Sequence, residues 1–140
     1  MNQRSIGTRI KEVMTGKVVT VTEGTTLKEL KDAFERWDFN AFPVVRGDRV
    51  VGMVTKLDLM KAFMLGKTVA PGRMASFYEQ KVGELMRRAV VSVGPEDSVE
   101  RAVEYMMEFK LRSLPVIENG RLVGMVSRTD ILPHLLMAEG

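Results

Sequence analysis

Two short patterns in the chain place a carboxylate three positions after a hydroxyl: Thr55-x-x-Asp58 and Ser127-x-x-Asp130. Both follow the tripeptide Gly-Met-Val, and both precede an apolar segment with helical spacing. A hydroxyl beside the unpaired backbone N–H groups of a helix start forms an anion site, for which phosphate is the obvious ligand. A carboxylate at this position can accept hydrogen bonds from a ribose diol, as acidic residues do in dinucleotide sites.

The same patterns have a second interpretation, because Ser, Thr and Asp at this spacing also cap helix N-termini. Taken singly, each pattern favours a cap. Their recurrence at equivalent positions favours at least one nucleotide site, in which apolar residues such as Val18 and Val90 could sandwich the base.

Ser127 lies 72 positions after Thr55 because the chain contains two copies of one unit. At this offset the sequence aligns with itself without a gap over residues 10–65, and the best match pairs 49–58 with 121–130. A unit of about 55 residues buries too little apolar surface to be stable alone. The two copies are therefore expected to pack face to face.

Each copy begins with the same two predicted elements. A short apolar strand is expected at 18–21 and at 90–93. The helix that follows is expected to begin at a capping box, Thr-x-x-Glu at 26–29 in the first copy and Asp-x-x-Glu at 97–100 in the second.

Two antiparallel strands and a last helix complete each copy. A tight turn joins the strands, and Asn119-Gly120 in the second copy is typical of a type I′ turn. The last helix is expected to begin after Thr55 or Ser127, with Pro133 inside its first turn, where proline is tolerated.

The composition excludes several classes of protein. The 140 residues include no cysteine, so disulfides, thiolate metal sites and cysteine nucleophiles are impossible and a cytoplasmic location is expected. The chain has no apolar signal core and no run of the roughly 18 to 20 apolar residues that span a membrane. Its net charge of +3 comes from scattered basic residues, which argues against a nucleic-acid partner.

Enzyme motifs are missing as well. The chain contains no G-x-S-x-G, no G-x-x-x-x-G-K-[ST] and no His-rich metal pattern. The single histidine, His134, is expected to be a surface or packing residue. A role without catalysis is therefore expected.

The ordered motifs resemble those of the cystathionine-β-synthase-type (CBS) domain pair, also called a Bateman module. The resemblance covers residues 10–65 and 82–137. It rests on Met14-Thr15 before the first strand, on Phe-Pro-Val-Val and Leu-Pro-Val-Ile, and on hairpins that end in Gly-Met-Val-Thr-x-x-Asp and Gly-Met-Val-Ser-x-x-Asp. Each motif alone is weak, but the set repeated at constant spacing is specific.

The resemblance implies an α/β (α+β) fold in which tandem β-α-β-β-α repeats pack sheet to sheet with pseudo-twofold symmetry. The implied organisation is an N-terminal extension at 1–9, a first CBS repeat at 10–65, a connector at 66–81 and a second repeat with a C-terminal helix at 82–140. Modules of this family commonly hold adenosine-containing ligands in two clefts, so a regulatory module that senses AMP, ADP, ATP or S-adenosylmethionine is expected.

The resemblance also implies the lining of each cleft, because the Ser/Thr-x-x-Asp of one repeat completes a cleft walled by the first strand and the pre-proline segment of the other. The first cleft would combine Ser127, Thr129 and Asp130 with Thr15, Val18, Val19, Phe39 and Asn40. The second would combine Thr55, Leu57 and Asp58 with Arg87, Val90, Val91, Leu111 and Arg112.

The two implied clefts differ chemically. Arg87 stands where the family often has Thr, and the pre-proline Arg112 has Asn40 as its counterpart. Arg112 and Lys56 could bind a polyphosphate, so their cleft is expected to prefer more phosphates. Arg128 would serve the other cleft or point to solvent. Bound phosphates often bring Mg²⁺ with them, so a magnesium ion beside the ligand stays open.

The last helices carry more apolar side chains than one small core can absorb: Leu59, Met60, Phe63, Met64, Ile131, Leu132, Leu135 and Leu136. A homodimer built from these helices is expected, as in other modules of the family. The regulated partner protein cannot be named from the sequence. The alternative to ligand sensing is a dimerisation or docking scaffold without a bound nucleotide.

Overall fold

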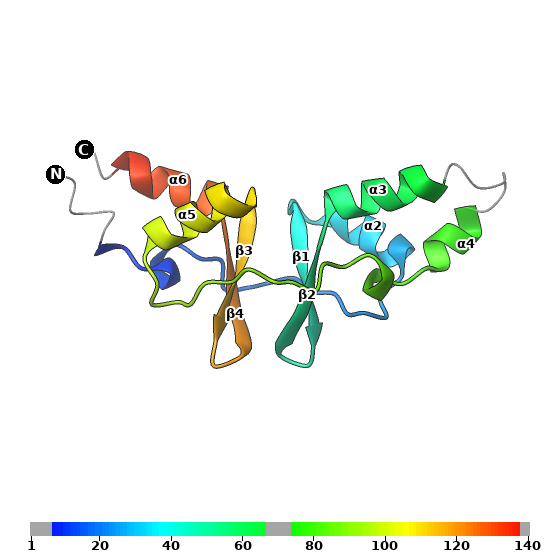
Figure 1. Cartoon of the computed structure of the whole chain (residues 1–140), viewed down its shortest axis with the longest axis horizontal. Coiled ribbons are helices and arrows are strands. Elements are labelled where there is room, and N and C mark those ends of the chain that lie inside the picture. Colours follow the sequence, from blue (N-terminus) through cyan, green and yellow to red (C-terminus); the bar gives the residue numbers. More distant parts are fainter. Residues whose placement is uncertain (1–6, 67–73, 138–140) are drawn as a thin grey trace. The chain divides into compact units, whose positions relative to one another are not determined.

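The computed structural model describes residues 7–66 and 74–137, which belong to two compact units (Figure 1). Unit 1 comprises the chain up to residue 18 and from residue 91 onward, and unit 2 comprises residues 19–90. Each unit contains a two-stranded antiparallel sheet together with helices. The expected α+β fold is confirmed.

Unit 2 is built around a hairpin of β1 (Ala41–Arg46) and β2 (Arg49–Thr55). Its helices are α2 (Leu27–Arg36), α3 (Lys56–Gly66), α4 (Met74–Glu79) and the 3-10 helix η2 (Val82–Glu84). The core consists of apolar residues from the hairpin and the helices around it, among them Leu27, Leu30, Phe42, Val44, Val54 and Val82, which are completely buried.

Unit 1 repeats this plan with the hairpin of β3 (Ser113–Glu118) and β4 (Arg121–Ser127). Its described part includes the 3-10 helix η1 (Ile10–Glu12), α5 (Val99–Phe109) and α6 (Arg128–Met137). Asn119 and Gly120 have φ angles of 52° and 79°. Positive values at both positions are what a type I′ turn requires, so this prediction is confirmed.

Each compact unit takes its opening segment from the other repeat. Ile10, from the first repeat, is buried in the core of unit 1, where its N–H donates to the carbonyl oxygen of Asp97 at 2.9 Å. Val82, from the second repeat, is buried in unit 2, and its N–H donates to the carbonyl oxygen of Thr25 at 2.8 Å. Burial of Ile10 and Val82 anchors these exchanged segments.

The prediction of a strand at the start of each repeat is wrong, because only one residue of each predicted strand pairs with a neighbouring strand. Val21 forms a single parallel bridge with Val44, in which its N–H donates to Pro43 and its carbonyl accepts from Val45. The next bond of a parallel ladder would run from the N–H of residue 43 to the carbonyl of Val19, and proline has no N–H. The second repeat behaves alike, with a single bridge between Val93 and Val116 beside Pro115.

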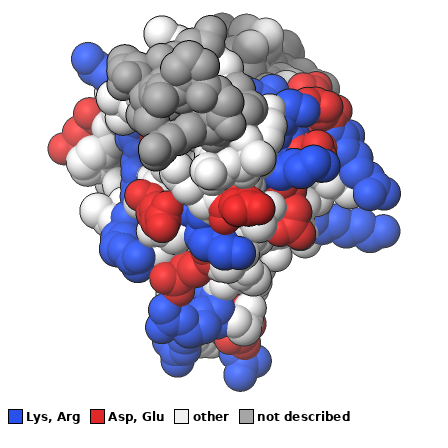
Figure 2. All heavy atoms as spheres, turned by 90° about the vertical axis from the view of Figure 1, so that its right-hand side faces the viewer, with Lys and Arg blue, Asp and Glu red and all other residues white. Residues whose placement is uncertain are grey.

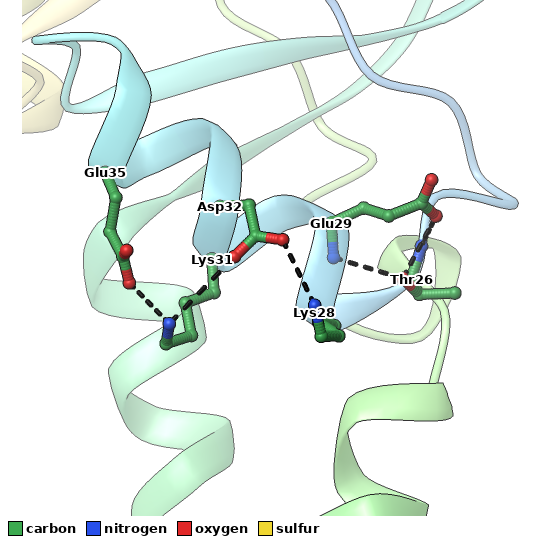
Figure 3. A network of polar contacts seen from close by, with 6 residues as sticks. All are labelled: Thr26, Lys28, Glu29, Lys31, Asp32 and Glu35. Carbon is green, nitrogen blue, oxygen red and sulfur yellow. Dashed lines mark hydrogen bonds and ion pairs between the residues drawn. The ribbon is translucent and has the colours of Figure 1, made fainter.

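The capping box predicted for α2 is confirmed. Thr26 Oγ1 accepts from the Glu29 N–H at 3.1 Å, and the Glu29 carboxylate accepts from the Thr26 N–H at 2.9 Å (Figure 3). The hydrogen bond from the backbone of Thr26 lowers the pKa of Glu29. The exposed face of this helix carries spaced ion pairs, which contribute little to stability: Lys28 with Asp32, and Lys31 with Glu35.

The predicted start of α5 is wrong by one residue. The N-cap is Ser98, whose Oγ accepts from the Arg101 N–H at 3.2 Å. Asp97 caps the preceding turn instead, because its carboxylate accepts from the Gly94 N–H at 2.7 Å. The helix N–H group is thus capped by the serine, while the carboxylate holds the turn before it.

Pro133 is not in the first turn of its helix, contrary to expectation. Helix α6 begins at Arg128, so Pro133 is its sixth residue and lies in the interior. The carbonyl group of Thr129 thereby loses its intrahelical donor. Thr129 is exposed, so water can satisfy this carbonyl, and the neighbouring His134 is exposed as expected.

Candidate functional site

The starts of α6 and α3 carry the same pair of reciprocal hydrogen bonds. In unit 1 the Ser127 N–H donates to Asp130 Oδ2 at 2.9 Å, and the Asp130 N–H donates to Ser127 Oγ at 3.1 Å. In unit 2 Thr55 and Asp58 make the same two bonds, at 2.9 and 3.1 Å. Both hydroxyl–carboxylate patterns therefore cap their helices, and each cap occupies one oxygen of the carboxylate.

The backbone of the first turn of α6 is less open to an anion than the sequence suggested. Three of its first four N–H groups already have acceptors: Ser127 donates to Asp130, Asp130 donates to Ser127, and Arg128 donates to the Arg112 carbonyl oxygen at 3.0 Å. At most the N–H of Thr129 is left for a phosphate. The prediction that several backbone amides are free at this helix start is therefore wrong. Side chains must supply most contacts to a ligand.

The exchanged segment places Thr15 beside this helix start. The N–H of Thr15 donates to the Met125 carbonyl oxygen at 2.8 Å, and the Met125 N–H donates back to Thr15 at 3.0 Å. The approach depends on Gly124, since a Cβ there would lie 2.9 Å from the Thr15 carbonyl oxygen. Unit 2 shows the same arrangement with Arg87, Met53 and Gly52. The glycine repeated in both hairpins was the sequence signal for this close approach of the two backbones.

The two helix starts differ in what faces the carboxylate. In unit 2 Arg87 Nε donates to Asp58 Oδ1 at 3.2 Å, and Asp58 is only 9% exposed. In unit 1 the position of Arg87 is taken by Thr15, and Asp130 Oδ1 has no hydrogen bond within the described part of the chain. Both oxygens of Asp58 therefore accept a hydrogen bond within the unit, whereas Asp130 keeps one oxygen for a ligand.

The model of the CBS domain family matches residues 10–65 and 82–136. The chain belongs to the CBS domain family. The CBS domain-containing protein YhcV of Bacillus subtilis is 31% identical over 130 residues, which are 93% of this chain and 87% of YhcV. Other relatives are much longer: the chain spans 13% of the A-adding tRNA nucleotidyltransferase of Geobacter sulfurreducens, to which it is 27% identical.

Solved structures of CBS-domain proteins share the fold. CBSX2 in complex with AMP has a TM-score of 0.80 and 22% identity, with 96% of this chain and 100% of that chain covered. The CBS domain pair of MJ0100, in complex with 5′-methylthioadenosine and S-adenosyl-L-methionine, has a TM-score of 0.78 and 22% identity, with 91% and 99% covered.

The residues implied for each CBS cleft are distributed over both units. Unit 1 contains nine of them: Thr15, Val18, Val91, Leu111, Arg112, Ser127, Arg128, Thr129 and Asp130. Unit 2 contains the other nine: Val19, Phe39, Asn40, Thr55, Lys56, Leu57, Asp58, Arg87 and Val90. The structure thus places Thr15 and Asp130 in the same unit, and brings Arg87 into contact with Asp58.

Several of these residues make hydrogen bonds within their own repeat, between the start of the last helix and the segment before the hairpin. The Lys56 N–H donates to the Asn40 carbonyl oxygen at 3.0 Å, just as Arg128 does to Arg112. The side chain of Arg128 is anchored as well, because its Nε donates to the Leu111 carbonyl oxygen at 3.1 Å. Arg128 is therefore tied to its own unit.

Unit 1 also contains an apolar groove that the sequence did not predict as a feature. It lies between α5 and α6, has a volume of about 670 Å³, and is lined mainly by apolar side chains, including Val103, Met106, Met107, Ile131, Leu132 and Leu135. Ile131 is 2% exposed and belongs to the core, so it is not one of the exposed residues expected on this helix. Leu132 and Leu136 are exposed, as expected.

The described residues contain neither a metal-binding cluster nor a membrane-spanning helix. No cluster of three or more His, Asp or Glu side chains could hold a metal ion in the parts of the chain that the structure covers. In the same ranges, no helix has the length and apolar character needed to cross a bilayer.

Proposed function

We propose that this CBS-domain protein is a regulatory module that binds an adenosine-containing ligand and catalyses no reaction itself. The observation that carries the proposal is the repeated Ser/Thr–Asp pair at the starts of α3 and α6, with Asp130 keeping one carboxylate oxygen for a ligand. Related folds support the choice of ligand, since CBSX2 is in complex with AMP and MJ0100 with 5′-methylthioadenosine and S-adenosyl-L-methionine. Adenosine is the part these ligands share.

In this proposal Asp130 accepts hydrogen bonds from the ribose diol, and Val18 and Thr15 lie in the same unit to contact the nucleoside. The exposed guanidinium of Arg112, which the resemblance assigns to the other cleft, belongs to the same unit and is a second group available to an anionic ligand. Since most first-turn amides are already engaged, phosphate is not the main determinant of binding. We therefore expect AMP, ATP and S-adenosylmethionine to share one mode of ribose recognition.

The face drawn in Figure 2 gives no support to nucleic acid as an alternative ligand. On the face drawn in Figure 2, basic and acidic side chains lie interspersed. A nucleic-acid site would need a basic patch or stripe to follow the phosphate backbone.

Calorimetric titration tests the proposal directly. We expect saturable binding of at least one of AMP, ADP, ATP and S-adenosylmethionine, and weaker binding of the guanosine nucleotide with the same number of phosphates. Equal affinity for adenosine and guanosine compounds would contradict adenosine recognition. If no compound in the panel produces heat or displaces a fluorescent adenine nucleotide, the scaffold interpretation replaces ligand sensing.

We further propose that the protein is a homodimer in which apolar side chains of α6 contact the partner. Leu132 and Leu136 are 54% and 65% exposed and lie one helical turn apart, and Leu132 lines the groove between α5 and α6. Apolar surface of this kind usually marks an interface, and twofold dimers are the commonest assembly. Light scattering is expected to give the dimer mass for the parent and the monomer mass for the double variant Leu132→Glu/Leu136→Glu.

His134→Glu is the matched control for this experiment. It adds one negative charge to the same helix, where the double variant adds two, and two positions along an α-helix turn its side chain to nearly the opposite side from Leu132. The control is expected to remain dimeric. A monomer mass for the parent across micromolar concentrations would refute the dimer.

A further inference from the structure

Both oxygens of the Asp58 carboxylate already accept a hydrogen bond. Its Oδ2 accepts from the Thr55 N–H at 2.9 Å, and its Oδ1 accepts from Arg87 Nε at 3.2 Å. The carboxylate is almost completely buried, whereas the side chain of Arg87 is 50% exposed. The guanidinium therefore covers Asp58 from the solvent side with a charge-assisted hydrogen bond.

The position of Arg87 is fixed by its own backbone. Its N–H and carbonyl group both bond to Met53, at 2.8 and 2.9 Å, and a Cβ at Gly52 would lie 2.9 Å from its carbonyl oxygen. The side chain thus starts from a defined point beside the first turn of α3. A ligand that needs Asp58 must displace a guanidinium that the fold holds nearby.

The equivalent place in unit 1 is open. Thr15 makes the same two backbone bonds to Met125 but carries only a short hydroxyl side chain. Within the described residues, Asp130 Oδ1 has no hydrogen bond, and Asp130 is partly exposed. A ribose diol can approach this carboxylate without breaking an ion pair.

We propose that Arg87 is a specificity-determining residue that closes Asp58 to ribose, so that each chain binds one adenosine ligand, at Asp130. This inference rests on the proposed function. A ribose hydroxyl at Asp58 would have to displace the cationic Arg87 and offer only a neutral donor in its place, which corresponds to roughly ten- to hundredfold weaker binding. The Asp58 site therefore stays empty at concentrations that saturate the Asp130 site.

Calorimetric stoichiometry tests the inference in both directions. The parent is expected to bind one equivalent of the tightest adenosine ligand of the panel per chain, and Arg87→Thr, which copies the residue at position 15, is expected to bind two. Thr15→Arg is expected to weaken binding at Asp130 by ten- to hundredfold. Because this second variant changes the other unit, it keeps the test decisive if Arg87→Thr folds poorly.

Arg88→Thr is the matched control. Arg88 is adjacent in sequence, but its guanidinium contacts the Gly83 carbonyl oxygen and Glu23, not Asp58. One equivalent is expected for this variant. Two equivalents in the parent, one in folded Arg87→Thr, or unchanged affinity in Thr15→Arg would each overturn the inference alone. No binding to the parent or to any variant would overturn the proposed function, and the inference with it.

Discussion

Replacing Gly124 by Ala is expected to lower the free energy of unfolding by about 1–3 kcal/mol, the usual cost of overpacking a buried position. A Cβ at Gly124 would lie 2.7 Å from Met14 Sδ and 2.9 Å from the Thr15 carbonyl oxygen. The sulfur can move, but the carbonyl group cannot, because Thr15 is bonded to Met125 through both its N–H and its carbonyl. The added methyl group must therefore push the exchanged segment away from β4.

Urea denaturation followed by circular dichroism measures this change. Gly16→Ala is the control, because no heavy atom lies within 4 Å of a Cβ at Gly16, which is exposed. Its midpoint is expected to stay close to that of the parent. A Gly124→Ala midpoint equal to that of Gly16→Ala would show that the contact with Thr15 is not a tight constraint. Gly52→Ala is expected to behave like Gly124→Ala in unit 2.

The hairpins and the helices that follow them could be predicted from sequence because their signals are local. The Asn119-Gly120 turn and the Thr26 capping box each depend on residues within four positions of one another. The prediction of the first strand failed because the pairing of this strand depends on a partner more than twenty residues away. Apolar alternation around Val21 gives no warning that the partner strand presents Pro43, which cannot donate.

The exchange of segments between repeats could not be derived from the repeat itself. An offset of constant length shows that Ile10 and Val82 are equivalent, and both are indeed buried. It does not show whether each packs on its own repeat or on the other. That choice is made by tertiary contacts, such as the bond from Ile10 to Asp97.

In the candidate site, too, local features could be predicted from the sequence and tertiary contacts could not. The Ser/Thr–Asp spacing predicted the helix starts correctly, but the first-turn amides were assumed to be free. Their acceptors include the carbonyl groups of Asn40 and Arg112, in segments that precede the hairpins. The ion pair between Arg87 and Asp58 was not predicted either, because the bridge to Met53 brings these two residues together.

The carboxylate of Asp130 is expected to contribute most to ligand affinity. Asp130→Ala should weaken binding of the adenosine ligand by roughly ten- to hundredfold, equivalent to about 1.5–3 kcal/mol for a hydrogen bond to a charged group. It should also lower the free energy of unfolding by about 1 kcal/mol, because the Ser127 N–H loses its acceptor. The two effects must be separated, since a frayed α6 would itself weaken a neighbouring site.

Asp130→Asn separates them. The amide oxygen can still accept from the Ser127 N–H, but an amino group replaces the oxygen that would accept from the ribose, so stability should stay near that of the parent while affinity falls. Asp32→Ala, which removes an exposed carboxylate of α2 that pairs with Lys28, is the control for the loss of one negative charge. Calorimetry and urea denaturation of the three variants give both quantities. Parent-like affinity in Asp130→Asn would mean that Asp130 serves only as a helix cap, and that ribose is recognised elsewhere.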